Sequence, residues 1–158
     1  MVEMSHLDDA GQARMVDVGG KADSLRRAVA SGQVRCTPEV IEKIRQKKMV
    51  KGDVLAVARV AGIMSAKRTS ELIPLCHPLP IDAVSVDFEL GREHIAIRVE
   101  VSTVGKTGVE MEALTATSVA ALTLYDMCKS LDRDMVIERV QLEEKTGGKS
   151  GAFVREKK

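Results

Sequence analysis

Two stretches with a side-chain period of two constrain the fold of this chain more than any other feature. Residues 83–90 read AVSVDFEL and residues 94–101 read HIAIRVEV, so apolar and other side chains alternate in both. This is the period of a β-strand that buries one face and exposes the other. The three residues GRE join the stretches. The pattern predicts an antiparallel hairpin with one apolar and one polar face.

Helical patterns precede this hairpin. Residues 37–48, TPEVIEKIRQKK, have Thr37 in position to cap a helix and Pro38 at its first turn. Residues 51–72 repeat the arrangement, with Asp53 as the cap and apolar residues at helical spacing. Both segments are predicted to be helices.

The rest of the chain adds strands and one long helix. The patterns predict short strands over 12–18 and 135–144, and a helix over about 109–131; residues 22–35 fit either a helix or a strand. Strands and helices that are mixed around an antiparallel pair indicate an α+β fold and not a doubly wound α/β sheet. No repeat or linker interrupts residues 1–158, so we expect one domain, with 1–12 and 152–158 as flexible termini.

Composition excludes several classes of protein. The net charge is +1 and aromatic residues make up 2%, so neither a basic surface nor an aromatic platform for nucleic acid is expected. No run of apolar residues is long enough to cross a membrane, and the N-terminus has no apolar leader. The 3 cysteines include no CxxC pair, so neither a disulfide framework nor a zinc site is indicated. We expect a cytoplasmic protein that binds no nucleic acid, membrane or metal.

A stiff loop follows the second predicted helix. Residues 71–82, ELIPLCHPLPID, hold Cys76 and His77 among three prolines, which exclude both a helix and a regular strand. Adjacent cysteine and histidine are poorly spaced for one metal ion. The loop is either a rigid wall that hydrogen-bonds a polar ring, or only a tight connection to the hairpin; these residues alone do not decide between the two.

The long helix carries charges at both ends. Glu110 and Glu112 lie near its start, and Asp126 and Lys129 lie three positions apart near its end. The helix dipole favours the first pair, and the second could be an ordinary solvated ion pair. However, YDMCK stands in a helix of otherwise small and apolar residues. Glu112 and Asp126 are roughly 21 Å apart along an ideal helix, so either the ligand is long or two subunits share a site.

Lysines provide a second group of candidates. Several stand beside glycine or a helix end, where an ammonium and backbone N–H groups can approach one anion together. Neither Gly-Lys loop is a P-loop, because Glu100 and Glu143 stand where that motif needs glycine. The lysines are either solvated or part of a local phosphate pocket: Lys51, Lys67, Lys106, Lys145 and Lys149.

Taken together, four segments closely resemble the MoaC family of molybdenum cofactor biosynthesis, whose members are cyclic pyranopterin monophosphate synthases. The segments cover most of the chain, and LIPLCHPL together with TGVEMEALTA and YDMCK is highly specific. They are residues 15–21, 51–82, 107–129 and 145–151.

The resemblance implies a ferredoxin-like α+β fold, with the helices on one face of an antiparallel sheet. It implies a homohexamer, a trimer of dimers, whose active sites lie at subunit interfaces. The implied reaction converts 3′,8-cyclo-7,8-dihydro-GTP, a nucleotide-derived small molecule, to cyclic pyranopterin monophosphate and diphosphate. This lyase reaction consists of an acid–base rearrangement and an intramolecular phosphate cyclisation. No cofactor is implied, and the sequence leaves open whether Mg²⁺ accompanies the triphosphate.

The resemblance also assigns roles to particular residues. The catalytic residues of the family fall on Asp126, Lys129 and Lys51. Its substrate-contact motif falls on Leu75, Cys76, His77, Met111 and Glu112. Glu110, Lys67, Lys145 and Lys149 are added as substrate-binding candidates, the lysines because they can neutralise a triphosphate.

Two other classes of function compete with this interpretation. A non-catalytic ligand-binding module would explain the fold, but not the charged YDMCK segment. A metal-dependent phosphohydrolase would need a cluster of carboxylates and histidines, and the sequence has none at suitable spacing.

Overall fold

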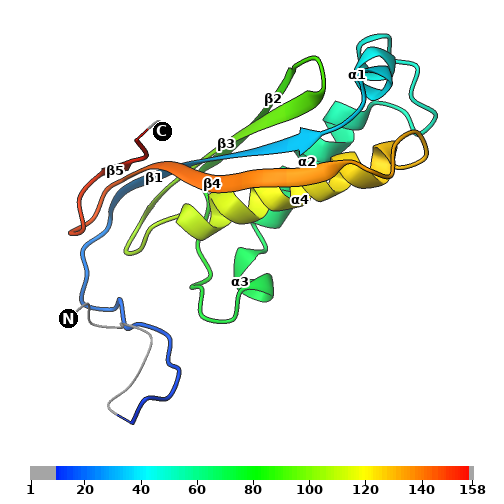
Figure 1. The fold of residues 1–158 in the computed structure, drawn as a ribbon. Helices are drawn as coiled ribbons and strands as arrows, with labels where there is room; N and C mark the ends of the chain where they lie inside the picture. Colours follow the sequence, from blue (N-terminus) through cyan, green and yellow to red (C-terminus); the bar gives the residue numbers. More distant parts are fainter. Residues whose placement is uncertain (1–9, 157–158) are drawn as a thin grey trace.

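A computed structural model of the chain describes residues 10–156 (Figure 1). The helices and strands follow one another as β1 (Ser24–Arg35), α1 (Pro38–Arg45), α2 (Val54–Ala66), α3 (Thr69–Leu72), β2 (Ala83–Leu90), β3 (His94–Gly105), α4 (Glu110–Cys128), β4 (Val136–Thr146) and β5 (Phe153–Val154).

One antiparallel sheet organises the molecule. Its strand order is β2-β3-β1-β4-β5, and α2 and α4 pack against each other and against strands of this sheet. Figure 1 shows both helices on the same side of the strands. Without α1, α3 and the two-residue β5, the order of elements is that of a ferredoxin-like β-α-β-β-α-β unit. The predicted α+β fold, with helices packed on one face, is confirmed.

The predicted hairpin is present as β2 and β3. Val84, Val86 and Phe88 lie opposite Val101, Val99 and Ile97. These side chains belong to the core or pack against it. The positions between them carry polar and charged side chains, which lie on the sheet face away from the helices.

The helix layer lies close to the sheet because the facing residues are small. A methyl group added at Gly32 of β1 would lie 2.7 Å from Thr117 Cγ2 of α4. A methyl group added at Gly62 of α2 would lie 3.2 Å from the Ala116 carbonyl oxygen. The alanines of α4 that lie in the core let α2 and the sheet approach: Ala113, Ala116, Ala120 and Ala121.

Both predicted helix starts are confirmed, with one difference. The Asp53 carboxylate accepts the Ala56 amide at 3.0 Å, so it caps α2 as expected. Thr37 is the N-cap residue of α1 and Pro38 its first residue, but the Thr37 side chain makes no capping bond. Instead the Thr37 amide donates to Asp132 Oδ2 at 2.9 Å, which ties α1 to the end of α4.

The helix predicted over 51–72 is present, but it is divided in two by a break at residues 67–68. α2 ends at Ala66, and the four-residue α3 begins at Thr69 after a turn. The Thr69 hydroxyl donates to the Ala66 carbonyl at 3.0 Å, and such a bond competes with the backbone pattern of a continuing helix.

The strand predicted over 12–18 is wrong, since only an isolated bridge at Ala13 is present there. The ambiguous segment 22–35 contains the central strand β1, which is buried between β3 and β4. The C-terminal segment expected to be flexible includes β5, which pairs with β4 at Lys145 and Glu144. Residues 1–9 and 157–158, which belong to the expected flexible termini, lie outside the described residues.

Candidate functional site

A pocket of about 350 Å³ lies at the N-terminal end of α4. It brings together three segments that are far apart in the sequence. The stiff loop contributes Leu75, Cys76, His77 and Leu79; the start of α4 and the loop before it contribute Thr107, Gly108, Glu110, Met111 and Glu112; the N-terminal arm contributes Val16, Val18 and Lys21. Six of the residues predicted to bind substrate therefore line one pocket.

The stiff loop is held by hydrogen bonds at both of its chemically reactive residues. A ring nitrogen of His77, Nε2, lies 2.8 Å from the Val16 carbonyl oxygen, so the N-terminal arm lies against the loop. The Cys76 amide donates to the Ile73 carbonyl at 3.1 Å. Burial, and secondly the charge of Glu112, raise the pKa of the Cys76 thiol. A thiol that stays protonated at neutral pH is a weak nucleophile.

Glu112 is the buried acid of this pocket. Only 4% of its surface is exposed. Burial raises the pKa of its carboxyl group to about 7, and the neighbouring Glu110 acts in the same direction. A carboxyl group with such a pKa can both accept and donate a proton near neutral pH.

The titration of Glu112 predicts a dependence of stability on pH. The pKa of Glu112 is higher in the folded chain than the ordinary 4.5, so the folded state binds more protons. The stability that this group contributes is complete below pH 4.5 and is lost as the pH rises through about 7. The loss amounts to at most about 3 kcal/mol.

We therefore expect Glu112→Gln to unfold at a higher temperature than the parent at pH 8.5, and to show less destabilisation between pH 5 and pH 8.5. Thermal unfolding of both proteins at the two pH values measures this. Asp134→Asn, an exposed acid beyond the same helix, is the control. An identical pH response in parent and Glu112→Gln would contradict the assignment.

A second cluster, formed by Lys51, Asp126 and Lys129, lies at the other end of α4. Lys129 Nζ is 2.7 Å from Asp126 Oδ1. Lys51 Nζ is 3.2 Å from Asp126 Oδ2 and donates to the Asp126 carbonyl at 2.8 Å. The two ammonium groups, Lys129 first, lower the pKa of the Asp126 carboxyl. This Asp126 cluster holds an ionised carboxylate between two cations, with all three side chains open to solvent.

The structure does not bring the Asp126 cluster to the pocket within one chain. Glu112 and Asp126 both lie in the single helix α4, near its opposite ends. The helical rise separates them by roughly 21 Å. Each chain therefore carries two groups of predicted site residues that only a long ligand could contact together.

The remaining candidate lysines differ in how close they lie to the pocket. Lys145 Nζ lies 3.9 Å from Glu110 Oε1 and 2.5 Å from Ser150 Oγ, next to the pocket. Lys67 is the exposed residue after α2, and Lys149 is exposed in the loop after β4; neither lines the pocket. Lys106 donates to the Gly19 carbonyl at 2.8 Å and so fixes the N-terminal arm.

The N-terminal arm is the part of the pocket that sequence reasoning missed. Val16, Val18 and Lys21 line the pocket, although the pattern predicted a strand for most of this segment. The short alternation in QARMVDV resembles a strand, and nothing local in these residues indicates a contact with His77, 61 positions away.

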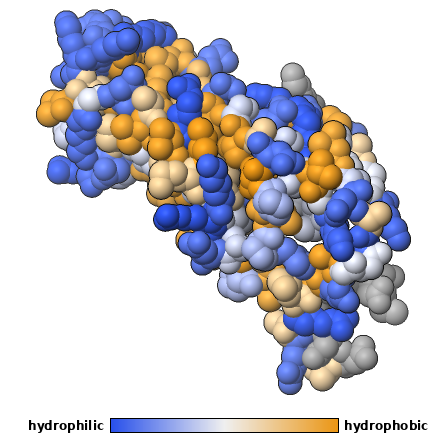
Figure 2. Space-filling model, turned by 180° about the vertical axis from the view of Figure 1, so that it is seen from behind, coloured by the Kyte–Doolittle hydropathy of each residue, from blue (hydrophilic) through white to orange (hydrophobic). Residues whose placement is uncertain are grey.

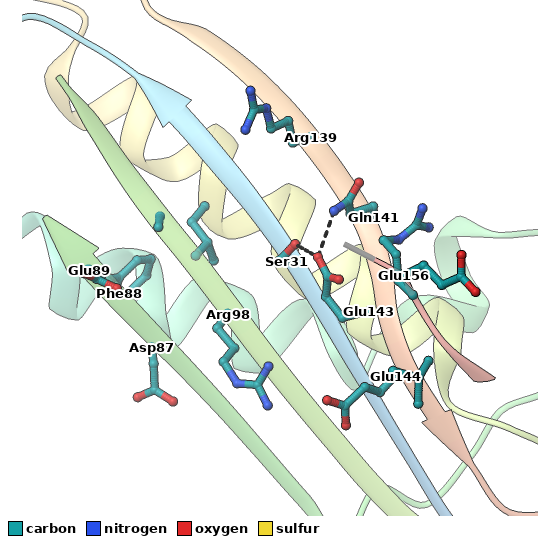
Figure 3. A pocket seen from close by; sticks show the side chains of 14 residues that line it. Ser31, Asp87, Phe88, Glu89, Arg98, Arg139, Gln141, Glu143, Glu144 and Glu156 are labelled. Atoms are coloured by element: carbon teal, nitrogen blue, oxygen red, sulfur yellow. Dashed lines mark hydrogen bonds between the residues drawn. The ribbon is translucent and has the colours of Figure 1, made fainter. Parts of the chain in front are cut away.

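A larger groove of about 1210 Å³ lies on the sheet face opposite the helices, and none of the predicted site residues line it (Figure 3). Two of its acidic side chains have partners. Glu144, which lines the groove, contacts Arg27 at 2.9 Å. Glu143 accepts hydrogen bonds from the Ser31 hydroxyl and the Gln141 amide, both visible in Figure 3.

Apolar surface remains on the helix layer. Three exposed side chains of α2 recur at helical spacing, Val57, Val60 and Met64. Figure 2 shows hydrophobic residues gathered in several patches between hydrophilic ones on the face behind that of Figure 1. Among residues 10–156 no three His, Cys, Asp or Glu side chains are grouped to hold a metal ion. No helix in the described part of the chain is long and apolar enough to cross a membrane.

The comparisons with known proteins agree with one another and cover nearly the whole chain. The family model described as "MoaC family" matches residues 15–148. A protein of Thermomicrobium roseum named "Cyclic pyranopterin monophosphate synthase" is 58% identical over 158 residues, which are 99% of this chain and 95% of the relative. Proteins with the same name are 58% identical in Roseiflexus sp. (98% and 99% covered) and 56% identical in Heliobacterium modesticaldum (99% and 99% covered).

Proposed function

Since the chain belongs to the MoaC family, a family of cyclic pyranopterin monophosphate synthases, we propose that it converts 3′,8-cyclo-7,8-dihydro-GTP to cyclic pyranopterin monophosphate with release of diphosphate. The chain is an enzyme of molybdenum cofactor biosynthesis, a lyase. The observation that carries the substrate proposal is the pocket in which Leu75, Cys76 and His77 face Met111 and Glu112.

The residue chemistry suits the proposed reaction. Opening a purine skeleton and closing it again as a pyranopterin needs several proton transfers. Glu112, whose pKa is near 7, can move protons in the pocket. The carboxylate of Asp126 can orient the ammonium of Lys129, 2.7 Å away, for proton transfer.

The phosphate step needs positive charge and not a further acid. A sugar hydroxyl attacks the α-phosphorus, a new P–O bond forms, and the bond to the leaving diphosphate breaks. Lysines near the triphosphate can neutralise the charge that develops there. Lys51, Lys145, Lys149 and Lys67 are the candidates on this chain.

The geometry of α4 supports a shared active site. The pocket of one chain is at the small end of the usual range for ligand sites, and the Asp126 cluster lies far from it. We propose that the pocket of one subunit and the Asp126 cluster of a neighbour form one site, in a homohexamer built as a trimer of dimers. Two surfaces support association: the uncovered sheet face, and the exposed α2 side chains Val57, Val60 and Met64. Light scattering on the purified chain tests the oligomeric state.

The function is tested by incubating the purified chain with the product of the upstream radical enzyme. We expect a fluorescent pterin and diphosphate in equal amounts. Binding of the cyclised GTP without turnover would favour a non-catalytic module. Complete loss of activity with a chelator would favour a metal-dependent phosphohydrolase, while loss that Mg²⁺ alone restores would show that the triphosphate binds as its magnesium complex.

A further inference from the structure

Arg26 is a nearly buried cation at the start of β1 to which neither group of site residues assigns a role. Its side chain lies at the edge of the core with 8% of the residue exposed. It forms no ion pair with any carboxylate of residues 10–156, and its side-chain hydrogen bonds go to backbone carbonyls. A buried cation usually has an anionic partner, so a positive charge without one favours an anion nearby.

The Arg26 guanidinium holds the loop between β3 and α4. Its Nε donates to the Gly105 carbonyl and its Nη2 to the Lys106 carbonyl, both at 3.1 Å. In a trans peptide the carbonyl and the next amide point in opposite directions. The amides of Lys106 and Thr107 therefore point away from Arg26. Thr107 and the following Gly108 line the pocket.

The same guanidinium supports the loop after β4. Gly147 and Gly148 both have positive φ angles, 96° and 76°. A methyl group added at Gly148 would lie 1.8 Å from Arg26 Nη1, and one added at Gly147 would lie 2.1 Å from the Leu25 carbonyl oxygen. Only glycine leaves room for this turn to rest on Arg26.

Arg26 thus joins the two Gly-Lys loops of the chain. Lys106 belongs to the first loop, and Lys145 and Lys149 flank the Gly147–Gly148 turn of the second. Successive amides in glycine turns, together with lysines, form concave sites for anions. Both loops end next to Glu110, which Lys145 contacts at 3.9 Å and against which Gly108 packs.

We propose that Arg26 is a positioning residue that holds residues 105–108 and the Gly147–Gly148 turn together. The amides and lysines of these two loops then form the binding site for the substrate's phosphate groups. The inference rests on the proposed function for the identity of the substrate. Arg26 acts through the two loops, and its guanidinium fork is required because two successive carbonyls must be held at once.

The first test removes the forked guanidinium of Arg26 and keeps its positive charge. A lysine at position 26 has one ammonium and cannot reproduce the paired geometry. We expect Arg26→Lys to raise the KM for the cyclised GTP, and the Kd for inorganic tripolyphosphate, by about tenfold or more, with kcat changed less than about threefold. Arg35→Lys, at the far end of the same strand, is the control and should leave all three values unchanged.

The second test leaves Arg26 in place and changes the glycine turn after β4 that packs on it. It also covers the case in which Arg26→Lys fails to fold. Gly148→Ala pushes a methyl group into the guanidinium, whereas Gly151→Ala meets nothing within 4 Å at a similar φ of 71°. Both variants place a side chain at a left-handed φ, so both carry backbone strain. We expect Gly148→Ala to weaken tripolyphosphate binding well beyond Gly151→Ala in calorimetric titrations.

The outcomes separate the two proposals. Unchanged KM and tripolyphosphate affinity in folded Arg26→Lys, or equal affinities in Gly148→Ala and Gly151→Ala, overturn the role of Arg26. A loss of kcat without any change in KM or affinity overturns it as well. If the parent binds tripolyphosphate in an Arg26-dependent way but makes no pterin, the result supports the phosphate-binding site and contradicts the proposed function.

Discussion

Replacing Asp126 by asparagine is expected to lower kcat by about 10²–10⁴-fold while the fold and the oligomer stay intact. The side chain of Asp126 is 58% exposed, so an isosteric change there does not disturb the core. The substitution removes the charge that holds the ammonium groups of Lys129 and Lys51. Pterin formation by the variant, with circular dichroism and light scattering, measures both parts of the expectation.

The matched control for this variant is Asp134→Asn, an exposed acid just beyond the same helix. It should leave kcat unchanged. If well-folded Asp126→Asn forms product at nearly the parental rate, Asp126 has no part in the mechanism and its cluster is an ordinary surface ion pair.

Two inactive variants should restore activity when they are mixed and reassembled. His77 lines the pocket, and Asp126 belongs to the cluster at the other end of α4. If each active site takes one residue from each of two subunits, a mixed dimer of His77→Ala and Asp126→Ala chains contains one intact site and one doubly defective site. Equal mixing then restores about a quarter of the sites for a two-fold symmetric interface.

Recovery is measured as pterin formation after the two variants are dissociated, mixed and reassembled, with each variant treated alone as the control. Native mass spectrometry of differently tagged chains establishes that mixed oligomers have formed. If they have formed and no activity returns, His77 and Asp126 act in the same subunit's site, and the shared arrangement must involve other residues or be absent.

The sequence predicted those parts of the fold that depend on local chemistry. The alternation in residues 83–101 specified the hairpin and its buried face, and Asp53 marked the start of α2. Predictions were wrong where the local sequence pattern was overridden by other contacts of the segment. Residues 12–18 alternate like a strand but contact His77 instead of a sheet edge, and α2 ends where the Thr69 hydroxyl binds its carbonyls.

The candidate site was predictable only in part for the same reason. Asp126 and Lys129 are neighbours on one helix, so their ion pair follows from helical spacing. Lys51 joins them from 75 positions away, and only the antiparallel packing of α2 and α4 brings it there. Nothing in the sequence indicated the role of Arg26. An arginine in a strand can be assigned to holding two loops only when the carbonyls and glycines around it are known.

The helix α4 has a consequence for how this chain can change in length. Because it carries Glu112 near one end and Asp126 near the other, adding or deleting one residue between them would rotate one against the other by about 100° and move it by about 1.5 Å. The close contacts of α4 with Gly32 and Gly62 leave no room to absorb that rotation. The number of residues between the two acids of α4 must therefore stay fixed.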